Sequence, residues 1–231
     1  MLALAGGALI VAAGGVRAAL FPSDRLLVGG LDASTPVWSS TGGHLAFLLH
    51  DSLGAHVGVY DFARGTHRVV GDTTGSDAGA FSWSPDGTRL AWAGPDVTGD
   101  GRGAINVYDV ATGESKPVAA GSSPRWKSDG SILAECGPDH PLFAADSDEA
   151  DGATAESGGE GAGSCRIDVA TGEVSRIDAP AQRVSNESPF PSRFAVSPDG
   201  KRIAYETLTD GKKPGGLGKR EIWLTIRQER P

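Results

Sequence analysis

Four segments of this chain share one spacing pattern, and this repeat constrains the fold more than any other feature of the sequence. The stretch "FSWSPDGTRLAW" shows the pattern: a Ser and a Gly lie between two apolar runs, and an apolar-Ala pair follows the Gly. The four copies are Val37–Phe47, Phe81–Trp92, Pro124–Glu135 and Phe194–Tyr205. The tryptophans of the first three copies lie 45 and 43 residues apart. This regular period indicates a structural repeat.

A second apolar unit with its own turn follows each copy. These units are Val57–Val70, Ile105–Val118, Cys165–Ile177 and the shorter Glu221–Ile226. Four short strands in a period near 43 residues are typical of one blade of a β-propeller. We therefore predict an all-β fold over residues 22–231, a β-propeller of about four blades, each a four-stranded antiparallel sheet. The approximate blades are residues 31–74, 75–119, 120–180 and 181–231.

The turn between the first two strands of a blade is explained by its residue types. In Ser84–Gly87, "SPDG", Pro presets φ, Asp accepts local hydrogen bonds, and Gly adopts positive φ without a Cβ clash. The stretch "ATGE" closes the next hairpin by the same chemistry. Asp86 is thus predicted to be a turn residue and not a catalytic carboxylate.

The composition agrees with many short strands and argues against some functions. Gly makes up 34 of the 231 residues, about twice the usual share of roughly 7%. No sustained helical periodicity occurs after residue 21. The formal charge of −8 argues against a nucleic-acid partner, because such proteins neutralise phosphates with Lys and Arg.

The N-terminal segment differs from the rest of the chain. Met1–Val16 has no charged side chain, and after Arg17 the apolar character continues through Ala18–Phe21. Its length lies between a signal-peptide core and a short membrane span. We predict an apolar N-terminal helix over residues 1–21 that acts as a signal or membrane anchor, so that the protein is membrane-anchored or secreted on the extracytoplasmic side. The alternative is a buried core helix.

The repeats resemble those of a known family. "FSWSPDGTRLAW…INVYDVATGE" and "FAVSPDGKRIAY…EIWL" are similar to the WD-repeat-like β-propeller repeats of the TolB family, and the resemblance covers Val37 to Ile226. It implies the blade fold strongly and function weakly. Propellers of this type serve as periplasmic interaction platforms, as sensor domains and as non-catalytic parts of peptidases.

The fourth blade lacks an outer strand, whereas the apolar stretch Asp24–Gly30 belongs to no blade. We predict that Arg25–Val28 supplies that strand by pairing with Glu221–Ile226, which would join the two ends of the chain and close the ring. An open ring would instead leave hydrophobic blade faces for a partner or for self-association.

The two cysteines of the chain are predicted to form a disulfide. Aligned on the turns, Cys136 corresponds to Ala93 and Cys165 to Asn106, positions that face each other across one hairpin. A bridge would clamp the base of an acidic insert at residues 144–163, and bridges suit an exported protein. Two reduced core cysteines are the alternative.

One loop has a partial calcium-binding pattern. Asp96, Thr98 and Asp100 lie at positions 1, 3 and 5 of a calcium-type loop, with Gly101 at position 6. Position 12 is Val107, where the EF-hand has a bidentate Glu. Calcium is therefore the one candidate cofactor, and an Asx-rich turn is the competing interpretation.

Two charged loops occupy the same place, between the second and third strands, in blades 3 and 4. The acidic loop has six carboxylates between residues 146 and 160 and no basic residue, and the loop in blade 4 is basic. We predict that they form a charged docking face, with two solvated loops as the alternative. The candidate residues are Asp146, Asp148, Glu149, Asp151, Lys212, Lys213, Lys219 and Arg220.

No catalytic motif occurs in the sequence: G-x-S-x-G, H-E-x-x-H and the P-loop are all absent. Trp38, Trp83 and Trp126 repeat at one blade position, so we expect them in the core between blades. We predict no catalytic residues and a scaffold that binds a protein or peptide. The alternatives are an accessory or sensor domain of an enzyme or signalling protein, and a small propeller hydrolase or lyase.

Overall fold

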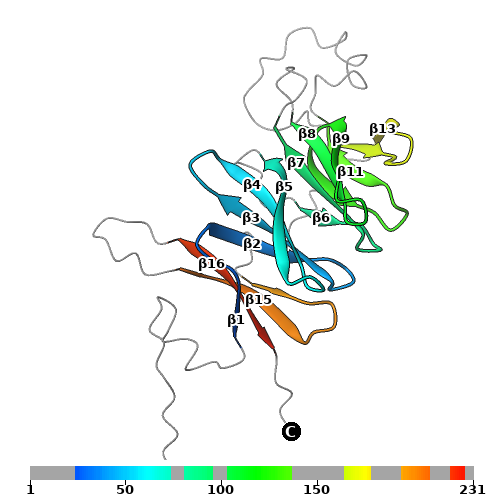
Figure 1. Cartoon of the computed structure of the whole chain (residues 1–231). Helices are drawn as coiled ribbons and strands as arrows, with labels where there is room; N and C mark the ends of the chain where they lie inside the picture. Colours follow the sequence, from blue (N-terminus) through cyan, green and yellow to red (C-terminus); the bar gives the residue numbers. More distant parts are fainter. Residues whose placement is uncertain are drawn as a thin grey trace, which may run out of the picture.

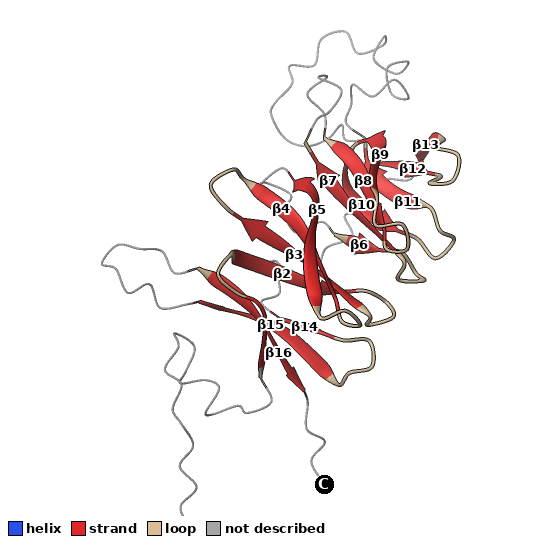
Figure 2. Cartoon of the chain, viewed as in Figure 1, coloured by secondary structure: helices blue, strands red, loops and turns tan. Residues whose placement is uncertain are grey.

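The computed structural model describes residues 24–73, 81–95, 103–136, 164–177, 194–208 and 219–226, and all regular structure in them is β-strand (Figure 2). The helix predicted over residues 1–21 lies outside these ranges. Within them, no helix is long and apolar enough to cross a membrane.

The strands form four sheets, and every neighbouring pair is antiparallel. Sheet 1 contains β2 (Asp32–Trp38), β3 (His44–His50), β4 (Ala55–Asp61) and β5 (Thr66–Thr73). Sheet 2 contains β6 (Ser82–Trp83), β7 (Arg89–Gly94), β8 (Ala104–Asp109) and β9 (Ser115–Ala120). Sheet 3 contains β10 (Ser122–Trp126), β11 (Ile132–Glu135), β12 (Ser164–Ile167) and β13 (Val174–Ile177). Sheet 4 contains β14 (Phe194–Val196), β15 (Arg202–Leu208), β16 (Arg220–Ile226) and β1 (Arg25–Val28). The prediction of four four-stranded blades is confirmed.

The Ser-Pro-Asp-Gly turn of sheet 2 is held by hydrogen bonds to the side chain of its Asp. Asp86 Oδ1 accepts from Ser84 Oγ at 2.5 Å and from the Thr88 backbone N–H at 3.1 Å. Gly87 has φ of 69°, in the region that favours glycine. The hydrogen bonds from Ser84 and Thr88 lower the pKa of Asp86 to about 2. Asp86 is thus a turn residue, as predicted.

The hairpin between β10 and β11 is one residue shorter than its equivalents. Trp126 pairs with Ile132, six residues on, whereas Trp83 pairs with Leu90, seven residues on. The sequence comparison treated these two hairpins as equal in length. From β11 onward, the residues of sheet 3 are therefore shifted by one relative to that alignment.

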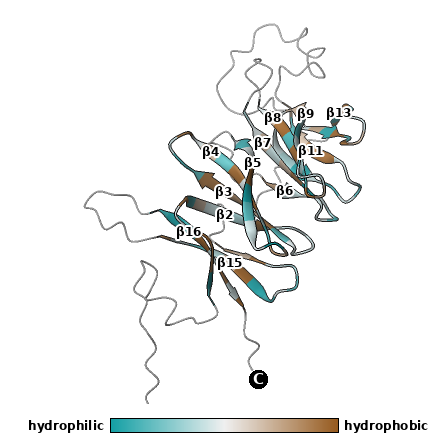
Figure 3. Cartoon of the chain, viewed as in Figure 1, coloured by the Kyte–Doolittle hydropathy of each residue, from teal (hydrophilic) through white to brown (hydrophobic). Residues whose placement is uncertain are grey.

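Three buried apolar clusters join the sheets in the spatial order 4, 1, 2, 3 (Figure 1). The hydrophobic stretches that form them run along the strands of each sheet (Figure 3). Tryptophans lie at the joints, as predicted: Trp38 Nε1 donates to Ala195 O of sheet 4 at 3.0 Å, and Trp83 Nε1 donates to Val37 O of sheet 1 at 3.1 Å. An arginine of the preceding sheet also covers the ring of Trp38, with Arg202 Cζ 4.6 Å from its centroid.

The pairing predicted between the two ends of the described chain is confirmed. Strand β1 pairs with β16, with Arg25 opposite Leu224, Leu26 opposite Trp223, and Val28 opposite Ile222. Sheet 4 therefore has four strands, three from the C-terminal part of the chain and one from the N-terminal part.

Closure of the ring, in contrast, was a wrong expectation. Strand β1 completes sheet 4 but does not bring sheet 4 to sheet 3, because the two sheets lie at opposite ends of an arc (Figure 1). Among the described residues, no buried apolar cluster joins sheets 3 and 4. Each of these two sheets consequently has one face without a neighbouring sheet.

Substitutions in β16 test the packing that β1 completes. Ile222 is completely buried and Ile226 is 56% exposed, so the same change at both positions compares core with surface in one strand. Ile222→Ala is expected to lower the free energy of unfolding by about 2–5 kcal/mol, because it leaves a cavity. Ile226→Ala should lower it by less than about 1 kcal/mol. Urea denaturation measures both, and equal losses would contradict the packing.

Candidate functional site

The face of sheet 4 that points away from sheet 1 is apolar. Strand register places Phe194, Tyr205, Trp223 and Leu26 in one row that crosses all four strands. A second row contains Val196 and Ile203. Phe194 is 58% exposed, Val196 47% and Leu26 43%. We call these six residues the open face of sheet 4.

The opposite side of the same sheet shows why this face is open. Side chains alternate across a strand, and Ala204, Ile222 and Leu224 point the other way and are buried against sheet 1. In the repeat, Val196 corresponds to Trp38, Trp83 and Trp126, which the preceding sheet covers in sheets 1, 2 and 3. No preceding sheet lies against Val196 among the described residues.

Polar atoms on the open face already have partners within the chain. The Tyr205 hydroxyl donates to Asp24, just before β1. Trp223 Nε1 donates to Glu221 Oε2 at 3.2 Å. A binding partner would therefore meet mainly aromatic and aliphatic surface, and burial of this face would not leave these two donors unpaired.

The other end of the arc has a different chemistry. On the outward face of sheet 3, Leu133 lies opposite Arg125 and Arg166 in neighbouring strands. Arg166 Nη2 donates to Asp129 Oδ2 at 2.7 Å, and both side chains are about half exposed. This face is charged and suited to water, whereas the open face of sheet 4 is not.

Two of the predicted docking residues are described, and both bind within the chain. Arg220 lies in β16, where Nε donates to Asp32 Oδ1 at 2.8 Å and Nη2 to Asp32 Oδ2 at 3.1 Å. The guanidinium lowers the pKa of Asp32 through this hydrogen bond and ties sheet 4 to sheet 1. Lys219 Nζ donates to Gly30 O at 3.1 Å. The other candidates lie outside the described residues: Asp146, Asp148, Glu149, Asp151, Lys212 and Lys213.

One charged cluster at the β3–β4 turn was missed by the sequence reasoning. His56 Nδ1 lies 2.7 Å from Asp72 Oδ1, and Nε2 lies 3.1 Å from Asp51 Oδ1. These hydrogen bonds, that to Asp72 first, raise the pKa of His56. Asp51 precedes His56 by only five residues, but Asp72 reaches it from β5, and no sequence motif links these two.

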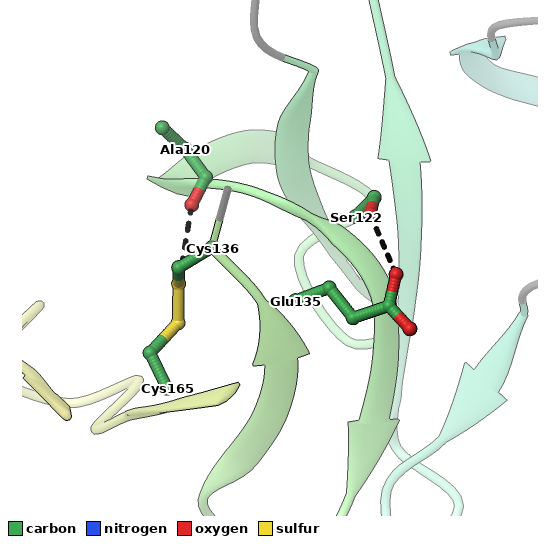
Figure 4. Close-up of a disulfide and its surroundings, with 5 residues drawn as sticks. All are labelled: Ala120, Ser122, Glu135, Cys136 and Cys165. Atoms are coloured by element: carbon green, nitrogen blue, oxygen red, sulfur yellow. Dashed lines mark hydrogen bonds between the residues drawn. A yellow bond between two sulfur atoms is a disulfide. The ribbon is translucent and has the colours of Figure 1, made fainter. Parts of the chain in front are cut away.

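The predicted disulfide is present and closes the base of the β11–β12 connection (Figure 4). Cys136 and Cys165 have Cα atoms 5.9 Å apart, and both are buried. Because of the shorter hairpin, Ala134 lies directly opposite Cys165, and Cys136 corresponds to Gly94 of sheet 2 instead of Ala93. A Cβ built on Gly94 would lie 2.4 Å from the side chain of Asn106, so these two positions are also adjacent in sheet 2.

The predicted residues of the calcium-type loop, Asp96, Thr98 and Asp100, lie outside the described residues. Within the described ranges, no group of three or more His, Cys, Asp or Glu side chains is arranged to hold a metal ion.

Two cavities lie at successive joints near the turns that join the third and fourth strands. One, of about 180 Å³, lies between sheets 1 and 2 and is lined in part by Asp61 and Arg68. The other, of about 560 Å³, lies between sheets 2 and 3 and is lined in part by Asp109 and Lys116. The carboxylates of Asp61 and Asp109 accept hydrogen bonds from the backbone of their own turns. Equivalent joints between neighbouring sheets produce equivalent cavities, so these cavities follow from the fold and we assign no ligand to them.

Comparison with solved structures finds proteins of similar fold. TolB from Acinetobacter baumannii is 19% identical over 84% of this chain and 43% of its own, with a TM-score of 0.42. The β-propeller domain of the Trilobed protease from Pyrococcus furiosus is 15% identical over 86% and 56%, with a TM-score of 0.46. An acylaminoacyl peptidase from Pyrococcus horikoshii is 18% identical over 84% and 31%, with a TM-score of 0.44. The chain thus spans between about a third and just over half of the length of these proteins. No protein-family model and no curated protein sequence matches it.

The His56 cluster predicts a titration that NMR can follow. The pKa of His56 should lie above 6.5, and Asp72→Asn should lower it more than Asp51→Asn. Since the folded-state pKa is raised, the contribution of His56 to stability is complete below about pH 6.5 and is lost as the pH rises through the folded-state value. Asp109→Asn, at the end of the third strand of sheet 2, is the control. An unchanged His56 titration in Asp72→Asn would refute the assignment.

The disulfide makes a separate prediction. The cysteines are 29 residues apart, and in the chain-entropy model a bridge of this span stabilises by about 3–4 kcal/mol. The double variant Cys136→Ala and Cys165→Ala should lose roughly this amount in urea denaturation. A thiol reductant should destabilise the wild-type protein and leave the double variant unchanged. If the reductant does not change the free energy of unfolding of the wild-type protein, the bridge does not stabilise the fold.

Proposed function

We propose that this chain is a non-enzymatic binding module, exported or membrane-anchored, that captures a protein or peptide partner on the open face of sheet 4. The observation that carries the proposal is the exposure of this apolar face at a position that sheets 1, 2 and 3 bury against a neighbour. Exposure of a large apolar side chain such as Phe194 to water is unfavourable, because its burial would stabilise the protein or a complex by about 25 cal/mol per Å² of apolar surface.

The shape of the surface favours a macromolecule over a small ligand. The row Phe194, Tyr205, Trp223 and Leu26 extends across the whole width of the sheet. A contiguous exposed apolar patch of this kind marks interaction surfaces in soluble proteins. Aromatic residues are also enriched where protein partners meet.

A scaffold role is supported by what the repeated carboxylates do. Asp86 and Asp199 accept hydrogen bonds within their first turns. Asp61, Asp109 and Asp168 accept backbone hydrogen bonds within the later turns. These groups are used to build the blades, which supports a binding role over a catalytic one.

Export or anchoring is supported by two independent features. The segment at residues 1–21 is almost entirely apolar. The Cys136–Cys165 bridge belongs to a class of bond that persists mainly in oxidising compartments. Both agree with a protein that works outside the cytoplasm.

Photo-crosslinking in the native cell tests the binding role. Phe194 is replaced by p-benzoylphenylalanine, and in a matched control Ser175, on the outward face of sheet 3, is replaced instead. We expect a covalent adduct with a protein at position 194 and none at position 175. Val196→Glu, in the same chain as the crosslinker, should remove the adduct without unfolding the protein, which circular dichroism checks. No adduct at position 194, or equal adducts at both positions, would overturn the proposal.

A further inference from the structure

We propose that the partner on the open face of sheet 4 is a second copy of this chain, and that two copies pack these faces together about a two-fold axis. This inference rests on the proposed function, because it uses the same face, and it adds the identity of the partner. In such an isologous contact each copy contributes the same patch, so the patch must be complementary to itself.

The open face meets that requirement because it is apolar across its width. The partner surface that buries Phe194, Val196 and Leu26 must itself be apolar, because a polar surface would lose its own hydration in the contact. In the described part of the chain, the other exposed large apolar residues are Leu31, Leu53, Val69, Leu208 and Ile226. Leu208 and Ile226 lie at opposite ends of the β15–β16 pair, opposite Arg220 and Arg202, and belong to neither row of the open face. The open face, with six residues in two adjacent rows, is therefore the apolar surface that we assign as its own counterpart.

The other end of the arc does not offer a matching surface. A head-to-tail contact would place the open face of one copy on the outward face of sheet 3 of the next. That contact would remove Arg125, Arg166 and Asp129 from water against an apolar surface. Burial of charges without new partners is strongly unfavourable. Face-to-face packing of sheet 4 buries none of these three charged groups, and the carboxylates of Asp24 and Glu221 keep the hydrogen bonds that they accept from Tyr205 and Trp223.

The size of the face predicts a weak dimer. Strands of three, seven, seven and four residues, with a rise of about 3.4 Å per residue and a spacing of about 4.8 Å, present roughly 350 Å² per copy, or about 700 Å² in the pair. Specific interfaces of standard size bury about 1,200–2,000 Å². The two copies should therefore exchange readily, with dimers favoured only at high local concentration.

The test co-expresses two copies of the full chain that carry different affinity tags. One copy has p-benzoylphenylalanine in place of Phe194, and the other copy carries the variants. We expect an adduct that contains both tags and has twice the mass of a single tagged copy. Val196→Glu in the second copy should reduce this adduct at least tenfold. Ser175→Glu in the second copy, on the outward face of sheet 3, should leave it unchanged.

Each other outcome has a defined meaning. A two-tag adduct that is lost with Ser175→Glu and kept with Val196→Glu would show head-to-tail contact and overturn the face-to-face arrangement. An adduct with a different protein, without the second tag, would overturn the dimer while the proposed binding function stands. The absence of any adduct at position 194 would overturn both.

Discussion

The whole structure depends on the packing of one sheet face against the next. A blade inside a propeller is apolar on both faces, so such a sheet needs a neighbour on each side. Here the joints use a repeated device, in which a tryptophan such as Trp38 or Trp83 donates its N–H to the preceding sheet. Three joints satisfy both faces of sheets 1 and 2. Among the described residues, sheets 3 and 4 each keep one face that no other sheet covers.

The two ends of the arc differ in how this incomplete burial is managed. Sheet 3 ends the arc with charged residues, among them Arg166 and Asp129, which water solvates. Sheet 4 ends it with Phe194, Val196 and Leu26, which water does not. Strand β1 completes the hydrogen bonding of sheet 4 at its outer edge but adds nothing to cover its open face. This asymmetry is the physical basis for a binding role.

Much of the fold could be predicted from the sequence because its signals are local. The hydrogen bonds of Asp86 and the positive φ of Gly87 depend only on residues within the turn. Four turns with a Gly at the same place in the repeat were enough to place the sheets. The shorter hairpin before Ile132 was missed because its turn residues Asp129 and Gly130 match Asp86 and Gly87 of sheet 2. The difference lies after the turn, where one residue fewer precedes the next strand.

The site was less accessible to sequence reasoning for two physical reasons. The alternation of Ile203 and Tyr205 on one side with Ala204 on the other is the same whether a neighbouring sheet is present or not, so the open end could be stated only as an alternative to closure. The pairing of His56 with Asp72 depends on the exact register of β4 and β5, which shifts at a bulge between Val57 and Gly58. The Cys136–Cys165 bridge was predictable because the repeat places β11 beside β12.

The distance between the two ends of the arc tests the central claim most directly. Spin labels on unnatural amino acids at Arg166 in β12 and Phe194 in β14, diluted with unlabelled chain, report the separation of sheets 3 and 4 within one molecule. Sheets pack about 10 Å apart, and three joints along the arc separate these two, so the open arc predicts a distance of about 20–30 Å. A distance of about 10–15 Å, as between neighbouring sheets, would show a closed ring and contradict the account.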